Sequence, residues 1–304
     1  MRSEADMVDR APAAALLPKH LEEVTCNLCG GCDEAQLFVK ESLRIVRCRQ
    51  CGLVYVNPRL PQSEIAQQYN ESYYTAGSYP DYLGERAGYE QTFERRLVEI
   101  ERLVPPSRIL DVGCAFGFFL NVAEKRGWEA HGIDLSPVGC RYATEQLGLR
   151  ATCCTLDQAG FPSGFFDVVI MNDTFEHLAD PTYDLRQAWQ VLRPGGFLFL
   201  VTQDSSRLIV RLLGRRWAQY KPREHLYYFA ARTLRGILEK TGFHILRIED
   251  EGLVCTVDFL MTKLGNISRP AGRVGGWLIR RFGLGSHLVF VRTGYEVMVC
   301  AQKI

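Results

Sequence analysis

The sequence predicts an α/β fold in which a doubly wound sheet follows a small cysteine-rich module. Three observations predict it. Two C-x2-C pairs occur within the first 51 residues, strand-like apolar runs alternate with helix-like runs from Arg108 onward, and polar residues recur directly after those strand-like runs. Such alternation is typical of a parallel sheet with helices on both faces, whose ligands bind outside the carboxyl ends of the strands.

Composition limits the classes of protein to which the chain can belong. Its 304 residues, 47% of them hydrophobic, suffice for one α/β core and a small appendage. The net charge of +1 provides no general attraction to nucleic acid, so we expect no nucleic-acid partner. No apolar run reaches the ~18 residues that span a bilayer, so we expect no transmembrane segment. Residues 1–20 lack the pattern of a signal peptide, so we expect a disordered leader and a cytoplasmic protein.

The cysteine pairs CNLCG and CRQCG have the spacing of a structural zinc ribbon, which we expect to span residues 21–60. The expected ligands are Cys26, Cys29, Cys48 and Cys51. A closed site of four sulfurs leaves no open position for water, so its role would be structural. The alternatives are a redox C-x-x-C or a chance pattern, and Cys32 is a substitute ligand.

Residues 61–106 are expected to form a linker and a helix that caps the ligand cleft. SEIAQQY predicts a short capped helix, and GYEQTFERRLVEIERLV has apolar residues at helical spacing before Pro105-Pro106. A tyrosine-rich stretch, 69–82, lies between them. It could line a ligand cleft, with Tyr74 closing over the ligand, or pack its rings on the next helix.

Strands and helices alternate over residues 107–304, the expected second domain. The predicted strands are RILDVG, EAHGID, LRATC, FFDVVIMN, GFLFLVTQ and YEVMVCAQK. The predicted helices are FFLNVAEKRG, SPVGCRYATEQLG, PTYDLRQAWQVLRPGG and AARTLRGILEKTG. Ser136 is expected to cap the second of these helices, with Pro137 at its first position. A glycine-rich segment at about residues 252–288 is expected to be an insertion on the substrate side.

The turn in ILDVGCAFGFFL indicates the kind of ligand. A dinucleotide site needs G-x-G-x-x-G, but counting from Gly113 the second and third glycines are replaced by Ala115 and Phe118. Asp111 would also place a negative charge beside a diphosphate. The turn therefore suits a nucleoside with a cationic centre and no phosphate, such as S-adenosylmethionine (SAM). Asp134, 21 residues after Gly113, stands where an acidic residue accepts hydrogen bonds from a ribose diol.

Four motifs in order resemble those of the class I SAM-dependent methyltransferases. They are LDVGCAFGFFL, GIDLSP, FPSGFFDVVIMNDTFEHLADP and VLRPGGFLFL. The resemblance covers about residues 108–249 and implies a Rossmann-like sheet of seven strands with a SAM site at its edge.

The resemblance also implies roles for single residues. It implies that the methionine end of SAM is lined by Asp111, Gly113 and Gly117, and Cys114 and Ala115 of the same turn are also expected to bind the cofactor. It implies that Asp134 binds the ribose, that Thr155 and Leu156 flank the adenine, and that Asn172 faces the sulfonium side. Leu135 and Asp173 are also expected to bind the cofactor. Ala115 departs from the glycine usual at its position, and its methyl group is expected to narrow the pocket without abolishing binding.

A narrower resemblance involves the cysteine module, which ends in CGLVYVNP, and KPREHLYYF after the fifth strand. Together they resemble a bacterial subgroup that includes sugar C-methyltransferases and natural-product or cell-surface glycan methyltransferases. The chain stops without the additional C-terminal domain of the deoxysugar C-methyltransferases. That departure leaves the type of methyl acceptor open.

Methyl transfer to a hydroxyl, or to a carbon beside a carbonyl, needs a general base as well as in-line positioning. Histidine is the default base because its pKa lies near neutrality. His225 is the first candidate, with Glu224 as its neighbour or orienter, and the subgroup resemblance supports this pair. The alternative is that EHLYYF only caps the following helix and packs on the sheet. His177 is the second candidate, and otherwise holds its loop by hydrogen bonds.

Residues 205–223 and 259–295 each contain six Arg or Lys and no Asp or Glu. RLIVRLLGRRW and GGWLIRRFGLG mix arginine with bulky apolar residues. This composition suits a phosphorylated or carrier-linked acceptor, or peripheral contact with a membrane surface. The alternative is a solvated helix face.

The sequence thus predicts a SAM-dependent methyltransferase with a structural zinc ion. We expect it to methylate, at carbon or oxygen, a small-molecule acceptor such as a sugar or glycan precursor or another specialised metabolite. Three alternatives stand beside this prediction: a methyltransferase for protein or nucleic acid recognised through the ribbon, a non-catalytic SAM-binding protein, and a nicotinamide-dependent enzyme, against which the glycine spacing argues.

Overall fold

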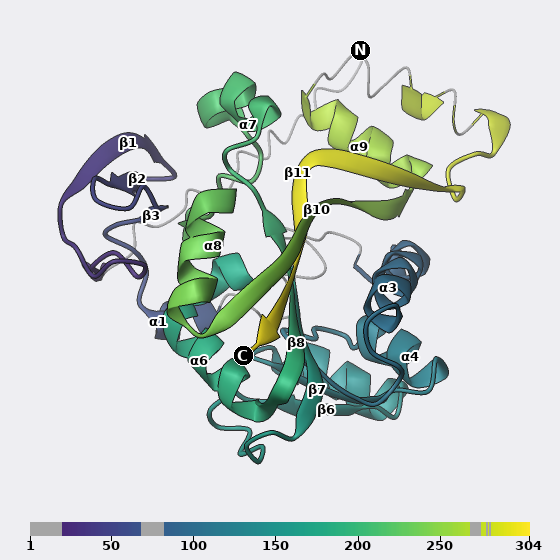
Figure 1. Cartoon of the computed structure of the whole chain (residues 1–304). Helices are drawn as coiled ribbons and strands as arrows, with labels where there is room; N and C mark the ends of the chain where they lie inside the picture. Colours follow the sequence, from purple (N-terminus) through teal and green to yellow (C-terminus); the bar gives the residue numbers. More distant parts are fainter. Residues whose placement is uncertain (1–19, 68–81, 268–274, 278, 280) are drawn as a thin grey trace, which may run out of the picture.

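The computed structural model describes residues 20–67, 82–267, 275–277, 279 and 281–304 (Figure 1). Nineteen of the twenty residues of the expected leader, and most of the tyrosine-rich stretch with Tyr74, lie outside the described residues.

A seven-stranded sheet lies at the centre of the α/β region, in the order β10-β11-β8-β7-β4-β5-β6. The strands are β4 (Arg108–Val112), β5 (Glu129–Asp134), β6 (Arg150–Cys153), β7 (Phe166–Asn172), β8 (Leu192–Gln203), β10 (Phe243–Thr256) and β11 (Leu288–Lys303). β4 to β8 pair in parallel, whereas β11 is antiparallel to both β8 and β10. The sheet expected to be parallel is therefore mixed, because β11 runs antiparallel to both of its neighbours at one edge.

Helices cover both faces of this sheet, so the predicted doubly wound architecture is confirmed (Figure 1). One face packs against α3 (Arg86–Glu101) and α4 (Phe118–Lys125), and the other against α6 (Pro181–Val191) and α8 (Ala231–Lys240). Adjacent residues of one strand serve opposite faces: Ile109 joins the core under α3 and α4, and Leu110 joins the core under α6 and α8. The central strands β4, β7 and β8 are mostly apolar because both of their faces are buried.

Helix boundaries differ from the prediction in two places. α6 ends at Val191, and the chain is already in β8 at Leu192, four residues before the predicted strand. Pro194 cannot continue a helix, and Gly195 takes a φ of 72°, so the extension to Gly196 was wrong. α1 (Gln62–Ala66) follows Pro61 and has no side-chain cap, so the expected capping there was wrong too. Ser136 does cap α5 (Pro137–Arg141), accepting a hydrogen bond of 3.2 Å from the Gly139 backbone N–H.

The cysteine module forms a second sheet, in the order β1-β2-β3-β9. β1 (Glu34–Lys40) and β2 (Leu43–Cys48) form the predicted hairpin, and β3 (Val54–Val56) pairs with β2. β9 (Tyr227–Tyr228) comes from the α/β region, and its two residues pair with Tyr55 and Val54 of β3. KPREHLYYF thus supplies a strand to the sheet of the cysteine module.

The C-terminal strands are longer than predicted. Residues 252–256 of β10 pair with residues 288–292 of β11, so regular pairing continues into the expected insertion. α9 (Val257–Ile267) follows β10, while α7 (Leu208–Leu213) and the 3-10 turn Gly214–Arg216 follow β8. Figure 1 shows α7 and α9 at the same end of the molecule. Among the described helices, none combines the length and the apolar character needed to cross a membrane.

Candidate functional site

The glycine turn after β4 lies where the strand order reverses. The chain runs from β4 to β5 and β6 toward one edge of the sheet and then returns to β7 on the other side of β4. Ligands of open α/β sheets bind at such a point. Gly113 has a φ of 85°, and a Cβ added to it would lie 2.2 Å from the hydroxyl oxygen of Thr174. Glycine is required here both by the left-handed backbone and by the close approach of the loop after β7.

Asp134, at the end of β5, faces this turn. Its two carboxylate oxygens accept hydrogen bonds from the backbone N–H groups of Ala115, at 2.8 Å, and Ser136, at 2.7 Å. Burial raises the pKa of Asp134, and these hydrogen bonds oppose the rise. Ala115 has a φ of 47°, a left-handed conformation that a glycine would adopt with less strain. Asp134, the residue expected to bind the ribose, is therefore in direct contact with Ala115, the residue that replaces a glycine.

Asp111 is a second carboxylate beside the turn, and it is only 2% exposed. Burial raises its pKa to about 7; the amide of Asn172, whose Nδ2 lies 3.4 Å from Oδ1, opposes the rise, and the charge of Asp134 adds to it. A cation bound beside Asp111 would favour its charged form. The structure thus brings together Asp111, Asp134 and Asn172, three of the residues expected at the cofactor.

Arg96 of α3 is a site residue that the sequence analysis missed. Its side chain is 2% exposed, and Nη1 and Nη2 donate hydrogen bonds of 3.0 Å to Asn172 Oδ1 and Glu296 Oε1. The carboxylates of Asp173 and Glu251 lie 3.6 Å and 3.8 Å from the guanidinium. Three acidic side chains therefore compensate one buried positive charge.

This arginine determines how Asn172 is oriented. Because Arg96 donates to the carbonyl oxygen of the amide, the amide nitrogen is directed to Asp111. A signal for Arg96 was present in the sequence: it stands three residues after Phe93 and four before Ile100, on the buried face of an amphipathic helix. An arginine at such a position needs buried acidic partners.

The residues expected at the adenine lie along the edge formed by β5 and β6. Leu156 is buried, Thr155 is half-buried, and the Thr155 hydroxyl donates to Asp157 at 2.6 Å. Leu135, the residue after Asp134, is half-buried as well. Cys114 is buried beneath the glycine turn. These positions share one edge of the sheet, and their roles toward a cofactor stay predictions.

The two candidate bases, His177 and His225, lie together although 48 residues separate them. Their ring centroids are 4.7 Å apart in an edge-to-face arrangement, and His225 is 4% exposed. Burial lowers the pKa of His177 to about 4 and that of His225 well below its ordinary value, so both rings are neutral at pH 7. The carboxylate of Glu224 lies 3.7 Å from Lys221 Nζ, and its backbone carbonyl accepts a hydrogen bond from His177. A role for Glu224 in orienting His225 stays a prediction.

Glu176 completes this group and was also missed. It is 1% exposed, its oxygens accept hydrogen bonds from Thr202 Oγ1 at 2.8 Å and Gln203 Nε2 at 2.6 Å, and burial raises its pKa to about 7. One polar atom from each of Glu176, His177 and His225 lies within 4.8 Å of the others. We call these three residues the histidine cluster. The sequence placed Glu176 directly before His177, two residues after Thr174, which covers the glycine turn.

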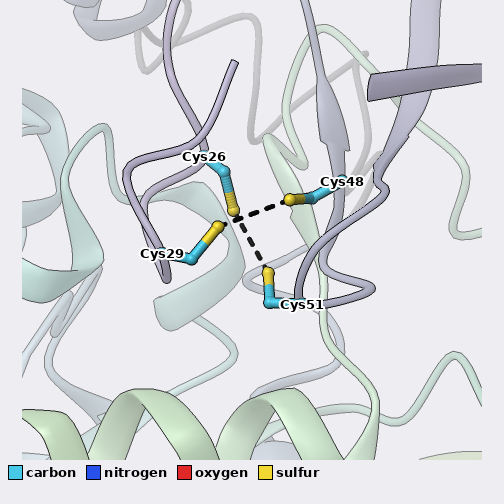
Figure 2. Close-up of side chains that lie close together, drawn as sticks. All are labelled: Cys26, Cys29, Cys48 and Cys51. Carbon is cyan, nitrogen blue, oxygen red and sulfur yellow. Dashed lines mark hydrogen bonds between the residues drawn. The ribbon is translucent and has the colours of Figure 1, made fainter. Parts of the chain in front are cut away.

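The four cysteines of the ribbon converge as predicted (Figure 2). All four sulfurs lie within 4.8 Å of one another, and the pairs Cys26–Cys51 and Cys29–Cys48 are 3.4 Å apart. A tetrahedral zinc ion with bonds of ~2.3 Å holds its sulfurs at nearly this spacing. Cys32 is exposed and stands outside the cluster.

The backbone around the sulfurs also fits a metal ion. Gly30 and Gly52 take φ angles of 78° and 83°, and their N–H groups donate to the carbonyls of Cys26 and Cys48 at 2.7 Å and 3.0 Å. Each C-x-x-C-G segment thus folds into the same tight turn. Burial alone would raise the pKa of the Cys48 thiol. Hydrogen bonds from backbone N–H groups to its sulfur outweigh this effect and lower the pKa to about 7. These donors stabilise a thiolate, the form that binds zinc.

The ribbon is hydrogen-bonded to the histidine cluster. The N–H of Val56 in β3 donates to the carbonyl of Leu226, and the N–H of Leu226 donates to the carbonyl of Glu176, both at 2.9 Å. Leu226 directly follows His225. Asn27, the residue after Cys26, adds a hydrogen bond of 2.7 Å to Asp180. The cysteine turns and the candidate base are therefore parts of one packed unit.

Comparison with known proteins agrees with this fold and site. Residues 85–248, more than half of the chain, match the family described as "Methyltransferase domain", and the chain belongs to that family. Its fold is that of the class I methyltransferases.

Curated relatives match a shorter part of the chain. A ubiquinone biosynthesis O-methyltransferase of Xanthomonas oryzae pv. oryzae is 32% identical over 133 residues, which are 38% of this chain and 55% of the relative. Its counterpart from Parvibaculum lavamentivorans is 30% identical over 126 residues, 40% and 49% of the two chains. The counterpart from Xanthomonas axonopodis pv. citri is 36% identical over 139 residues, 40% and 58%. The chain thus spans about half the length of the curated relatives it matches.

Solved structures match more of the chain at lower identity. A chain from the Haloferax volcanii complex of a methyltransferase activator with a methyltransferase aligns at a TM-score of 0.53 and 15% identity, over 79% of this chain and 97% of that one. A Bacillus halodurans protein described as a methyltransferase aligns at 0.51 and 16%, over 69% and 98%. These likenesses concern the fold.

Proposed function

We propose that the chain is an enzyme that transfers the methyl group of SAM to a small-molecule acceptor. One observation carries the proposal: two carboxylates, Asp111 and Asp134, flank the glycine turn at the reversal of the sheet. Both would repel a diphosphate, and Asp111 would attract the ammonium or sulfonium of SAM. The same arrangement argues against a nicotinamide dinucleotide.

In this proposal each residue of the turn has a task. Asp134 binds the ribose hydroxyls, Asp111 and the glycine turn hold the methionine end, and Asn172, oriented by Arg96, faces the sulfonium side. Thr155 and Leu156 flank the adenine. SAM, when bound, supplies the electrophilic methyl group. The helix α3 would then cap the cofactor cleft, as its buried Arg96 contact with Asn172 supports.

The histidine cluster would remove the proton of the acceptor. His225 is the first candidate and His177 the second, because a neutral imidazole can accept a proton and both rings are neutral at pH 7. Glu224 and Glu176 would support them. Burial of the cluster would also exclude water that competes for the methyl group.

The acceptor class follows from the two resemblances. The bacterial subgroup favours a sugar or glycan precursor or another specialised metabolite, and the relatives named O-methyltransferases favour an oxygen acceptor. A protein or nucleic acid recognised through the ribbon is the weaker candidate, because β9 and Asn27 bind the ribbon to the α/β region. The ribbon, residues 21–60, would then be a structural zinc unit.

Cysteine chemistry supports a cytoplasmic location. The eleven cysteines are all free thiols in the structure, including Cys26 and Cys51 at 3.4 Å. A reducing compartment would keep these cysteines reduced and therefore able to bind zinc. Zinc held by these four sulfurs would be closed to substrates.

Calorimetry tests the cofactor. SAM should bind with about 1:1 stoichiometry, and NADH should not bind. Tight binding of NADH, or no binding of SAM to a folded chain, would overturn the proposal. Methyl incorporation from labelled SAM into a panel of nucleotide sugars, phenols and lipid-linked sugars would then define the acceptor, with a protein lysate and nucleic acid as the competing substrates.

A further inference from the structure

We propose that α7 docks the protein on the surface of an anionic lipid bilayer. The motivating observation is a group of bulky aliphatic side chains on a short helix that the α/β core does not cover. Leu208 and Leu212 are 70% and 78% exposed, and Ile209 and Leu213 are 43% exposed. We call these four residues with Arg211, Arg215 and Arg216 the α7 patch.

The patch is held firmly in place. Val210, between its leucines, is 2% exposed, and Trp217, directly after it, is 1% exposed. Both join a core cluster that contains Ile45 and Val54 of the ribbon and Tyr228 of β9. The exposed leucines therefore belong to a helix whose opposite side is packed, so their exposure is a feature of the fold.

Positive charge surrounds the aliphatic side chains. Arg211, Arg215 and Arg216 are exposed, and none of the three forms an ion pair with any residue that the structure describes. No Asp or Glu occurs between residues 205 and 223. The net charge of the whole chain is only +1, so any attraction to an anionic surface has to come from this local patch.

A second segment at the same end of the molecule has the same composition. Trp277, Phe282 and Leu284 are 61%, 69% and 43% exposed, and Arg281 is exposed beside them. This segment follows α9, which Figure 1 shows at the same end as α7. The two segments thus share exposed apolar and basic side chains, and the helices α7 and α9 lie at the same end of the fold.

A bilayer fits this arrangement better than a protein partner does. A short helix that projects leucines and arginines offers little of the ~800 Å² per partner that a stable protein interface buries. Insertion of leucines at the boundary between headgroups and acyl chains needs no complementary shape, and arginines beside them bind anionic headgroups. Because the patch lies outside the histidine cluster and the glycine turn, the inference is independent of the proposed reaction.

Vesicle sedimentation tests the inference on the full chain. Vesicles of 70% phosphatidylcholine and 30% phosphatidylglycerol should sediment the protein at low salt, and pure phosphatidylcholine vesicles should not. L208S/L212S should reduce the bound fraction at least about tenfold, and R211Q/R215Q/R216Q should reduce it and remove its salt dependence. Matched controls are L103S/L246S, two leucines 41% and 45% exposed elsewhere, and R141Q/R186Q/R235Q.

The thermal unfolding midpoint of each variant checks that it is folded. Failure of the folded wild type to sediment with the anionic vesicles would overturn the inference. So would retention of L208S/L212S at the wild-type level. Binding to a polyglutamate peptide without binding to vesicles would assign the patch to an acidic polypeptide and would overturn it as well.

Discussion

The guanidinium of Arg96 lies 3.0 Å from the side-chain carbonyl of Asn172, and through that amide it reaches Asp111. The two residues are 76 positions apart, and one comes from the helix before Pro105 while the other ends β7. This contact joins the capping helix to the candidate cofactor site. The same buried guanidinium lies within 3.8 Å of the carboxylates of Asp173, Glu251 and Glu296.

Loss of Arg96 should destabilise the fold strongly. R96L removes the only cation that contacts Glu296 among the described ion pairs, and uncompensated buried charge costs about 3 kcal/mol or more. The free energy of unfolding, measured with urea, checks this. The control is R102L, whose side chain is 64% exposed and pairs only with Glu99; it should change stability by less than about 0.5 kcal/mol. Equal stability of R96L and wild type would contradict the assigned network.

SAM affinity should depend on pH through Asp111. Its pKa of about 7 means that it is largely neutral at pH 6 and charged at pH 8. A cationic ligand prefers the charged form, so the Kd for SAM should rise by up to about tenfold per pH unit below 7 and level off above it. In D111N the affinity should be lower and this pH dependence absent. Calorimetry at pH 6, 7 and 8 measures it, with D33N in the ribbon as the control; an unchanged profile in D111N would exclude Asp111.

Zinc should order the histidine cluster as well as the ribbon. C48S should lose the metal, and because β3 pairs with β9, amide exchange at Tyr227 and Tyr228 should accelerate. C32S alters an exposed cysteine that lies outside the group of four cysteines. It should retain about one zinc per chain and wild-type amide exchange at Tyr227 and Tyr228. Metal analysis and hydrogen exchange by mass spectrometry give the two measurements. Protected β9 amides in a zinc-free chain would show that the ribbon and the cluster are uncoupled.

Turnover should have an unusually low acid limb. A base whose pKa is about 4, as for His177, stays neutral well below the ordinary histidine range, so kcat at saturating SAM should persist to about pH 5. H225Q should lower kcat by about a hundredfold or more and leave the Kd for SAM within about twofold. H287Q, at an exposed histidine, should leave both unchanged. A kcat that falls near pH 6.5, or an active H225Q, would remove these histidines from the reaction.

Thr174 should make Gly113 irreplaceable. G113A combines a left-handed backbone with a Cβ only 2.2 Å from the threonine hydroxyl, whereas G148A has a similar φ, 68°, and nothing within 4 Å. G148A should lower the free energy of unfolding by about 1 kcal/mol. G113A should lower it considerably more and should also weaken SAM binding. The double variant T174A/G113A should recover part of the difference. Equal free energies of unfolding for G113A and G148A would contradict the close contact between Gly113 and Thr174.

Local patterns in the sequence were sufficient for most of the fold. The predictions of β4, β5, β7 and β8 and of the capped start of α5 were correct. Buried strands and helix caps favour particular residue types at neighbouring positions, so both can be recognised from local sequence. The boundary between α6 and β8 was misplaced, since the register of the sheet and not propensity decides where that chain becomes extended. The convergence of the four cysteines was predicted because metal geometry constrains their spacing.

Long-range contacts could not be read from spacing. Nothing near Arg96 in the chain identifies Asn172 or Glu296 as its partners, and nothing near Tyr227 shows that it pairs with the ribbon. The amino-acid order by itself determined the strands, the glycine turn and the cysteine pairs, because each depends on residues close in sequence. Tertiary structure alone decided which charges meet in the interior and which histidines face each other, because the free energy of burying a charge depends on partners that only the folded chain brings within reach.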